Sequence, residues 1–316
     1  MKVVTFDDIR NLKINSDTCY GWISEALATK KDSILPPKVS MSPYDTVFCN
    51  VMPSIISIDG KRIGGIKIIT RYPGRSPSLD GQLMIFDAET GEFLALMDAN
   101  WITAMRTGAV AAHSINLLAK SNFKTIGFIG LGNTARATLQ IFSDVFGKDL
   151  MVNVLKYKGQ ELDFIERFSN CSNLSFNIVE SYDEIVSKSD VVVSAVTYFD
   201  KDICSDEVYS NGILLVPIHT RGFTNCDLFF DKIFYDDIDH VSGFKNFSKF
   251  KKSAEISDIL QGKVKGRESD EEKILAYNIG ISIHDVFFGY KIYELLADEN
   301  SKIEINMGTP TEKFWI

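Results

Sequence analysis

Short hydrophobic runs separated by turn signals occupy the chain from about residue 44 to residue 98. Asp59-Gly60 lies between two apolar runs, which is the strongest short-range signal for a β-hairpin. A second turn at residues 89–92 separates the runs 83–87 and 93–98. The pattern predicts an antiparallel sheet in this part of the chain.

The hydrophobic period becomes helical after residue 103. Apolar residues then fall near one helical face, at Met105, Ala109, Ala112, Ile115 and Leu118. With Thr103 as the expected N-cap, Arg106 lies in the first turn of this helix.

Strand-like and helical stretches alternate beyond residue 125. Apolar runs recur at residues 125–129, 150–155, 174–179, 191–196, 213–218 and 232–235. Helical patterns lie between several of them, at 161–168 and after a capping-box pattern at Ser181 and Glu184. This alternation predicts an α/β fold: a Rossmann-type doubly wound parallel sheet plus an α+β domain with the antiparallel sheet.

A last helical pattern covers residues 281–296 and follows the sixth predicted strand with no further strand after it. We therefore expect this helix to pack back on the N-terminal domain. The predicted domains are residues 1–118 with 276–316, and residues 119–275.

The strand at residues 125–129 runs into a glycine-rich turn. Gly130 allows a tight reversal, Gly132 allows close approach of a pyrophosphate, and small Ala135 allows the next helix to pack near the sheet. Asn133 and Thr134 lie at the helix N-terminus, whose free N–H groups bind phosphates. In this context the turn indicates a dinucleotide site, and the alternative is an ordinary strand-to-helix turn.

Cofactor choice is decided at the end of the second Rossmann strand, where NAD enzymes usually place an acid. Lys156, Tyr157 and Lys158 occupy that place. Cations there would receive a 2′-phosphate, so the sequence predicts NAD or NADP with a preference for NADP, unless these lysines form only a solvated strand end. Thr107 and Thr197 complete the predicted cofactor contacts.

Composition narrows the function classes. The 316 residues suffice for two domains, and a net charge of −8 argues against a general nucleic-acid binder. Five scattered cysteines without a CxxC pair and four histidines without metal-ligand spacing predict reduced thiols and no metal site. The absence of an 18-residue apolar run predicts no membrane span, and the acidic N-terminus favours a cytoplasmic protein.

Lys67 and Arg106 are the first candidates for chemistry. Arg106 near a helix start can bind a carboxylate through two nitrogens, with help from the helix end. A lysine near other positive charge has a lowered pKa, which brings Lys67 toward an acid/base range. The alternative is that Lys67 lies on a solvated strand face and Arg106 in a surface ion pair.

Four segments together resemble the ornithine cyclodeaminase/mu-crystallin family, in order and in spacing. They are the segment around Lys67, the Asp98–Ala109 segment around Arg106, the turn Gly130–Ala135, and the stretch from Gly266 to Asp285. The resemblance implies a homodimer in which residues 1–118 and 276–316 bind substrate and dimerise, and 119–275 bind NAD(P). It also implies that Lys67 and Arg106 hold a substrate carboxylate, with Lys38 near a further carboxylate-binding position.

Two positions depart from the pattern of true ornithine cyclodeaminases. Asn50 stands where they carry a glutamate, and residues 216–222 offer no counterpart of their acid/base aspartate. Arg221 falls at or beside that aspartate, as in the opine-type, aminocarboxyethyl-glutamate dehydrogenase-like branch of the family. His219 is then the best local acid/base candidate and Lys67 the alternative.

The extra cations, which include Arg71 and Arg75, suit a substrate with more than one carboxylate. The sequence therefore predicts an NAD(P)-dependent oxidoreductase of an imino acid or an N-substituted, opine-like amino acid. The alternatives are a deaminating cyclase of the ornithine cyclodeaminase type and a non-catalytic binder of NADP or another ligand, as in mu-crystallin-like members.

Overall fold

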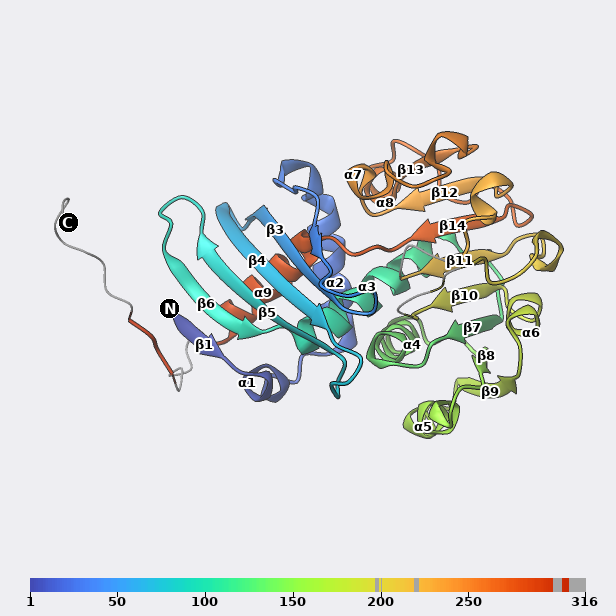
Figure 1. The fold of residues 1–316 in the computed structure, drawn as a ribbon, viewed down its shortest axis with the longest axis horizontal. Coiled ribbons are helices and arrows are strands. Elements are labelled where there is room, and N and C mark those ends of the chain that lie inside the picture. The colour runs from blue at the N-terminus through green and yellow to red at the C-terminus, as the bar shows by residue number, and fades with distance from the viewer. Residues whose placement is uncertain (197–198, 200, 219–221, 298–302, 307–316) are drawn as a thin grey trace.

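The computed structural model describes residues 1–196, 199, 201–218, 222–297 and 303–306, and its strands form two sheets (Figure 1). The six-stranded sheet has the order β1-β6-β5-β4-β3-β2, and the eight-stranded sheet has the order β13-β12-β14-β11-β10-β7-β8-β9. The predicted fold class, a parallel Rossmann-type sheet plus a domain with an antiparallel sheet, is confirmed.

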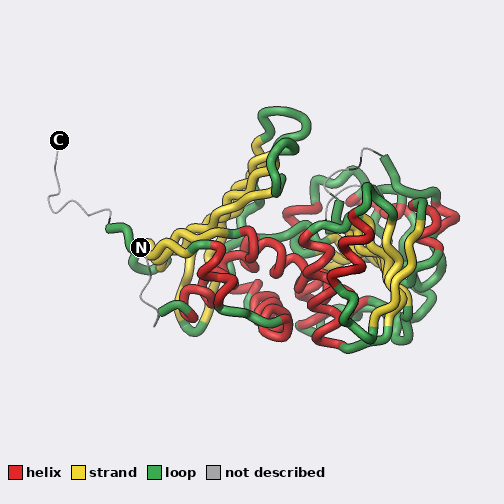
Figure 2. Tube along the Cα trace, turned by 90° about the horizontal axis from the view of Figure 1, so that it is seen from below, coloured by secondary structure: helices red, strands yellow, loops and turns green. Residues whose placement is uncertain are grey.

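The six-stranded sheet is antiparallel except where β1 runs parallel to β6. Asp59 and Gly60 both have positive φ in the β3–β4 turn, as a tight two-residue hairpin requires. Figure 2 shows helices on one face of this sheet only. Its strands are β1 (Lys2–Val4), β2 (Val39–Met41), β3 (Phe48–Ile58), β4 (Lys61–Arg71), β5 (Leu79–Asp87) and β6 (Phe93–Asp98).

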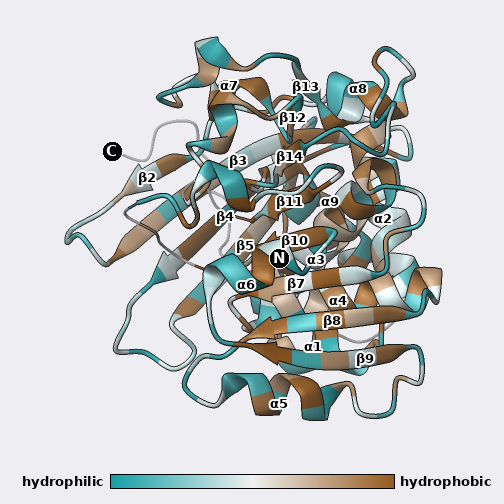
Figure 3. Cartoon of the chain, turned by 90° about the vertical axis from the view of Figure 1, so that its right-hand side faces the viewer, coloured by the Kyte–Doolittle hydropathy of each residue, from teal (hydrophilic) through white to brown (hydrophobic). Residues whose placement is uncertain are grey.

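Every neighbouring pair in the eight-stranded sheet is parallel. Its strands are mostly hydrophobic, whereas α5 outside it mixes hydrophilic and hydrophobic residues (Figure 3). The strands are β7 (Thr125–Ile129), β8 (Leu150–Leu155), β9 (Leu174–Val179), β10 (Val191–Ser194), β11 (Leu214–Pro217), β12 (Lys232–Tyr235), β13 (Ser253–Glu255) and β14 (Ile274–Tyr277).

Alternate residues of the parallel strands face two different cores. Val191 and Val193 join the large core that contains α3 and the six-stranded sheet, whereas Val192 faces a second core. The helices are α1 (Phe6–Asn11), α2 (Ser16–Ala28), α3 (Asn100–Leu118), α4 (Asn133–Phe146), α5 (Gln160–Arg167), α6 (Tyr182–Ser187), α7 (Ile238–Val241), α8 (Ile256–Leu260) and α9 (Ser282–Leu295). Short 3-10 turns lie at Lys30–Asp32, Asp206–Val208, Cys226–Leu228 and Phe247–Lys249.

Helix α3 connects the two halves, because it contacts both α4 and β11 of one half and α2, β5 and α9 of the other. Gly108 makes the α3–α4 contact close, since a Cβ there would lie 2.7 Å from the Ala137 backbone. Helix α9 packs on β3, β4 and β5, so the expectation that the last helix returns to the N-terminal sheet is confirmed.

Three local expectations were wrong. Helix α3 begins at Asn100, with Ala99 at its N-cap, so Thr103 is not the cap and Arg106 lies in the second turn. The eight-stranded sheet contains two strands that were not predicted, β13 and β14, because each is a short run within polar sequence. Strand β14 lies between β11 and β12, and it precedes α9, which contradicts the premise that no strand follows the sixth.

No helix within the described ranges is long and apolar enough to cross a membrane. The division into residues 1–118 with 276–316 and residues 119–275 stays a prediction.

Candidate functional site

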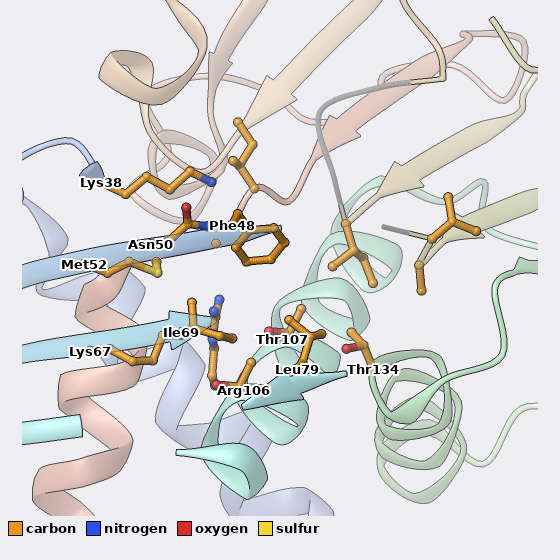
Figure 4. A pocket seen from close by; sticks show the side chains of 16 residues that line it. Lys38, Phe48, Asn50, Met52, Lys67, Ile69, Leu79, Arg106, Thr107 and Thr134 are labelled. Carbon is orange, nitrogen blue, oxygen red and sulfur yellow. The ribbon is translucent and has the colours of Figure 1, made fainter. Parts of the chain in front are cut away.

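A cavity of about 300 Å³ lies between the two sheets (Figure 4). One wall comes from β3, β4 and β5, and the opposite wall from the carboxyl ends of β10 and β11. Helix α3 contributes Thr103, Arg106 and Thr107, and the first turn of α4 contributes Thr134. Ligands of open α/β sheets bind at the carboxyl ends of the strands, so this cavity is the candidate active site.

Lys67 lines this cavity and is fully buried. Its Nζ donates a hydrogen bond of 2.7 Å to Oδ1 of Asp285, which is itself fully buried on α9. The same Oδ1 lies 2.9 Å from Nε of Arg106. One carboxylate oxygen therefore contacts the two cations that line the cavity from β4 and α3.

Two glycines allow α9 to come close enough for this contact. A Cβ on Gly65 would lie 2.6 Å from Val286, and a Cβ on Gly289 would lie 2.5 Å from Leu83. Gly289 is one helical turn beyond Asp285, so both residues face the sheet. The short aspartate side chain can therefore reach Lys67.

Arg106 is held from its other side by the segment after β14. Gly280 has φ +85°, and a Cβ there would lie 2.7 Å from Nη1 of Arg106. The backbone N–H of Gly280 donates to Asp236, a buried carboxylate at the end of β12. This glycine thus provides the space that the guanidinium occupies.

Burial and neighbouring charge shift the titration of these groups. Burial, followed by the nearby Arg106 guanidinium, lowers the pKa of Lys67 to about 7, although Asp285 opposes the change. Burial and Arg106 likewise lower the pKa of Lys38, and burial raises the pKa of Asp236. Lys67 can therefore both donate and accept a proton near neutral pH.

The glycine turn lies beside this cavity. Gly130 has φ +85° and packs against the Ala195 backbone, whereas a Cβ on Gly132 would meet nothing within 4 Å. Gly132 is the N-cap of α4 and supplies no side-chain cap, so the first N–H groups of α4 are available to an anion. These residues fit the phosphates of a dinucleotide.

The structure brings six of the predicted residues together. Lys38 reaches the cavity from the side opposite Arg106 in Figure 4. The predicted residues that line the cavity are Lys38, Asn50, Lys67, Arg106, Thr107 and Thr134.

Arg71 lies on β4 beyond these residues and pairs in register with Phe48 and Leu79, both of which line the cavity. Its Nη1 donates to the Thr46 carbonyl, 2.8 Å away. Arg75 instead folds back on its own loop, where it donates to the carbonyls of residues 70, 77 and 78.

The other predicted cofactor residues in the described ranges form the glycine turn or follow β8, and they do not line the cavity. Gly130, Gly132, Asn133 and Ala135 lie between β7 and the first turn of α4. Lys156, Tyr157 and Lys158 follow β8, where Lys156 pairs with Glu180 at 2.8 Å. Three more predicted site residues lie outside the described residues: Thr197, His219 and Arg221.

Sequence reasoning included Asp285 in a family segment but assigned it no chemistry. Its signal was an aspartate directly before the apolar run Val286-Phe287-Phe288 of a helix, because a carboxylate at such a position requires a partner. Gly280 and Asp236 were also missed, since only the folded chain brings them beside Arg106.

Comparisons with known proteins agree with this architecture. The model of the ornithine cyclodeaminase/mu-crystallin family matches residues 2–300. N-((2S)-2-amino-2-carboxyethyl)-L-glutamate dehydrogenase of Staphylococcus aureus is 27% identical over 72% of this chain and 71% of its own.

Two solved structures share the fold. Delta(1)-pyrroline-2-carboxylate reductase of Thermococcus litoralis, in complex with NADH and L-proline, superimposes with a TM-score of 0.84 at 22% identity, covering 96% of this chain and 100% of that one. An archaeal alanine dehydrogenase dimer with bound NAD gives 0.84 at 24% identity, covering 98% and 99%.

The contact between Gly280 and Arg106 predicts the effect of Gly280→Ala. The new Cβ displaces the guanidinium, so the Kd for pyruvate, used as a probe carboxylate and measured by calorimetry, should rise by at least about tenfold. Gly262→Ala is the matched control, because Gly262 also has positive φ but faces open space. Both variants should lose stability of about 1 kcal/mol from backbone strain. Equal pyruvate affinity in the two variants would contradict the role of Gly280.

Proposed function

This chain belongs to the ornithine cyclodeaminase/mu-crystallin family, and we propose that it is an NAD(P)-dependent oxidoreductase of an imino acid or an N-substituted amino acid. The reaction interconverts a carbon–nitrogen double bond and the corresponding amine. Relatives of the chain named as dehydrogenases and reductases support this class of reaction.

The observation that carries the proposal is the charge of the cavity beside the phosphate-binding turn. Lys38, Lys67 and Arg106 line it, whereas no Asp or Glu does so among the described residues. Such a cavity favours a carboxylate over a second amine. Asn50, which replaces a carboxylate of the cyclodeaminases, removes the charge that ornithine would need. An amino or imino acid without a basic side chain therefore fits best.

The residues that line the cavity would bind the substrate, transfer a proton and exclude water. Arg106 and Lys38 bind the substrate carboxylate and orient the reacting carbon toward the carboxyl ends of β10 and β11. Lys67, in its ammonium form, donates a proton to the imine nitrogen during reduction and takes it back during oxidation. Apolar side chains such as Leu79, Val196 and Ile218 limit the access of water.

A nicotinamide dinucleotide would be held by Gly132, the N-terminus of α4 and Thr134, and it supplies or accepts the hydride when bound. Lys156 and Lys158 lie where a 2′-phosphate would reach. The ion pair of Lys156 with Glu180 leaves Lys158 as the better phosphate ligand. We keep NADP as the preferred cofactor on this ground.

A second substrate carboxylate would be bound by Arg71. It lies two residues beyond Ile69 and four beyond Lys67 on the same face of β4, roughly 13 Å along the strand from Lys67. Its Nε is buried without a hydrogen-bond partner among the described residues. This arrangement suits an elongated, opine-like substrate with an anionic group at each end.

A homodimer would cover the helix-free face of the six-stranded sheet. Pro53, Ile66 and Met84 form a cross-strand row on this face, and Ile68 is 42% exposed beside it. An apolar row that no helix covers suits an interface. The dimeric archaeal neighbour of the same fold supports the assignment.

Turnover should appear as a net change of cofactor absorbance at 340 nm in a panel of 2-oxo acids with amines, cyclic imines and N-carboxyalkyl amino acids. We expect substrates with two or three carboxylates to give the highest kcat/KM, and NADPH to exceed NADH. Equal rates with the two cofactors would reject the preference for NADP alone. Ammonia release from ornithine without net cofactor change would indicate a cyclodeaminase, and tight NADPH binding without any turnover would indicate a binder.

The dimer is tested by Ile68→Glu. A charge at the centre of the interface should convert a particle of twice the chain mass to a monomer, as measured by light scattering. Met151→Glu is the control, because Met151 is similarly exposed at 39% but lies on β8 of the other sheet. Dimers that persist in Ile68→Glu would place the interface elsewhere.

A further inference from the structure

We propose that Asp285 is a positioning residue that keeps Lys67 protonated and directed at the substrate nitrogen. The inference rests on the proposed function, because it assigns Lys67 the proton of the imine. Asp285 does not line the cavity and so does not touch the substrate. It acts through Lys67 and Arg106.

Asp285 is the negative charge that Lys67 and Arg106 share. Its Oδ1 accepts from Lys67 at 2.7 Å and lies 2.9 Å from Arg106, and the carboxylate has no exposed surface. Its Oδ2 is buried with no hydrogen-bond partner in the part of the chain that the structure describes. A carboxylate oxygen left unbonded in the interior is costly, so the placement favours function over stability alone.

Three elements bring charged or titratable groups to face Lys67. Helix α9 brings Asp285 and His284, α3 brings Arg106, and the segment before β2 brings Lys38. Burial lowers the pKa of His284 well below its ordinary value, so this imidazole is neutral. Beyond them Asp236, at the end of β12, faces Arg106 and Lys38. Asp285 is thus the carboxylate in direct contact with Lys67.

The role of Asp285 follows from the proton balance of the reduction. A bound reduced cofactor would supply a hydride to the imine carbon, and the Lys67 ammonium donates a proton to the nitrogen and becomes a neutral amine. Without the Asp285 charge, Lys67 would lie buried beside Arg106 with no adjacent anion, and it would lose its proton at lower pH. The enzyme would then lack its acid at neutral pH.

The test is the pH dependence of kcat/KM for imine reduction in the wild type and in Asp285→Asn. Wild-type activity should fall as the pH rises through about 7, because neutral Lys67 cannot donate a proton. In Asp285→Asn this fall should occur about 1 to 3 pH units lower. Asp285→Glu keeps the charge and should restore the wild-type position with a reduced rate. Ionisation of the substrate is common to all variants and cancels in the comparison.

Ser282→Ala is the control for a purely structural effect on α9. Ser282 is buried one turn before Asp285 and donates to the Pro53 carbonyl at 2.6 Å, so its loss should lower stability without moving the pH profile. If Asp285→Asn is insoluble, the substitution is made with Arg106→Gln, which removes one buried cation, and the pKa of Lys67, measured by NMR titration without turnover, must be lower than in Arg106→Gln alone. An unmoved profile in active protein overturns the inference, whereas a wild type without imine reduction overturns the proposed function instead.

Discussion

The contact of one buried aspartate with two cations organises this site. Asp285 contacts Lys67 from β4 and Arg106 from α3, so three elements far apart in the sequence meet at one carboxylate. Isolated buried charges are costly, and the pairing makes it possible to hold two cations in the interior. The same burial lowers the pKa of Lys67 into the range where it can exchange a proton with a substrate. Charge pairing and chemistry thus depend on the same three residues.

The chain path makes this contact possible. After β14 leaves the parallel sheet, the segment through Gly280 passes Arg106. Helix α9 then runs along the six-stranded sheet (Figure 1). Close packing at Gly65 and Gly289 brings α9 against β4. On the opposite side of the cavity, Gly130 and Gly132 shape the turn beside the cofactor position. Small residues therefore place both the proposed proton-transfer groups and the proposed phosphate-binding groups around one cavity.

The antiparallel sheet, the parallel sheet and the last helix itself were predictable, because each follows from a local period of hydrophobic residues, whereas the return of that helix to the N-terminal sheet was expected from its position after the predicted strands. The β3–β4 hairpin at Asp59-Gly60 is an example. Strand β14 was not predictable, since its four apolar residues give no period and its place between β11 and β12 depends on tertiary pairing. The start of α3 was missed because Ala99 caps it without a side-chain hydrogen bond. Lys67 and Arg106 were identified as candidates, but the carboxylate that joins them comes from about 180 to 220 residues further along the chain, so no local pattern could reveal that Asp285 contacts these two cations.

The central claim is that Lys67 is buried with a lowered pKa and held by Asp285. The most direct measurement is an NMR titration of the lysine ¹³Cε signals in the wild type, with Lys67→Arg used to identify the Lys67 signal by its loss. The account predicts a midpoint for Lys67 near 7, far from the ordinary value of 10.5. A midpoint for Lys67 near 10.5, like those of the exposed lysines, would contradict it.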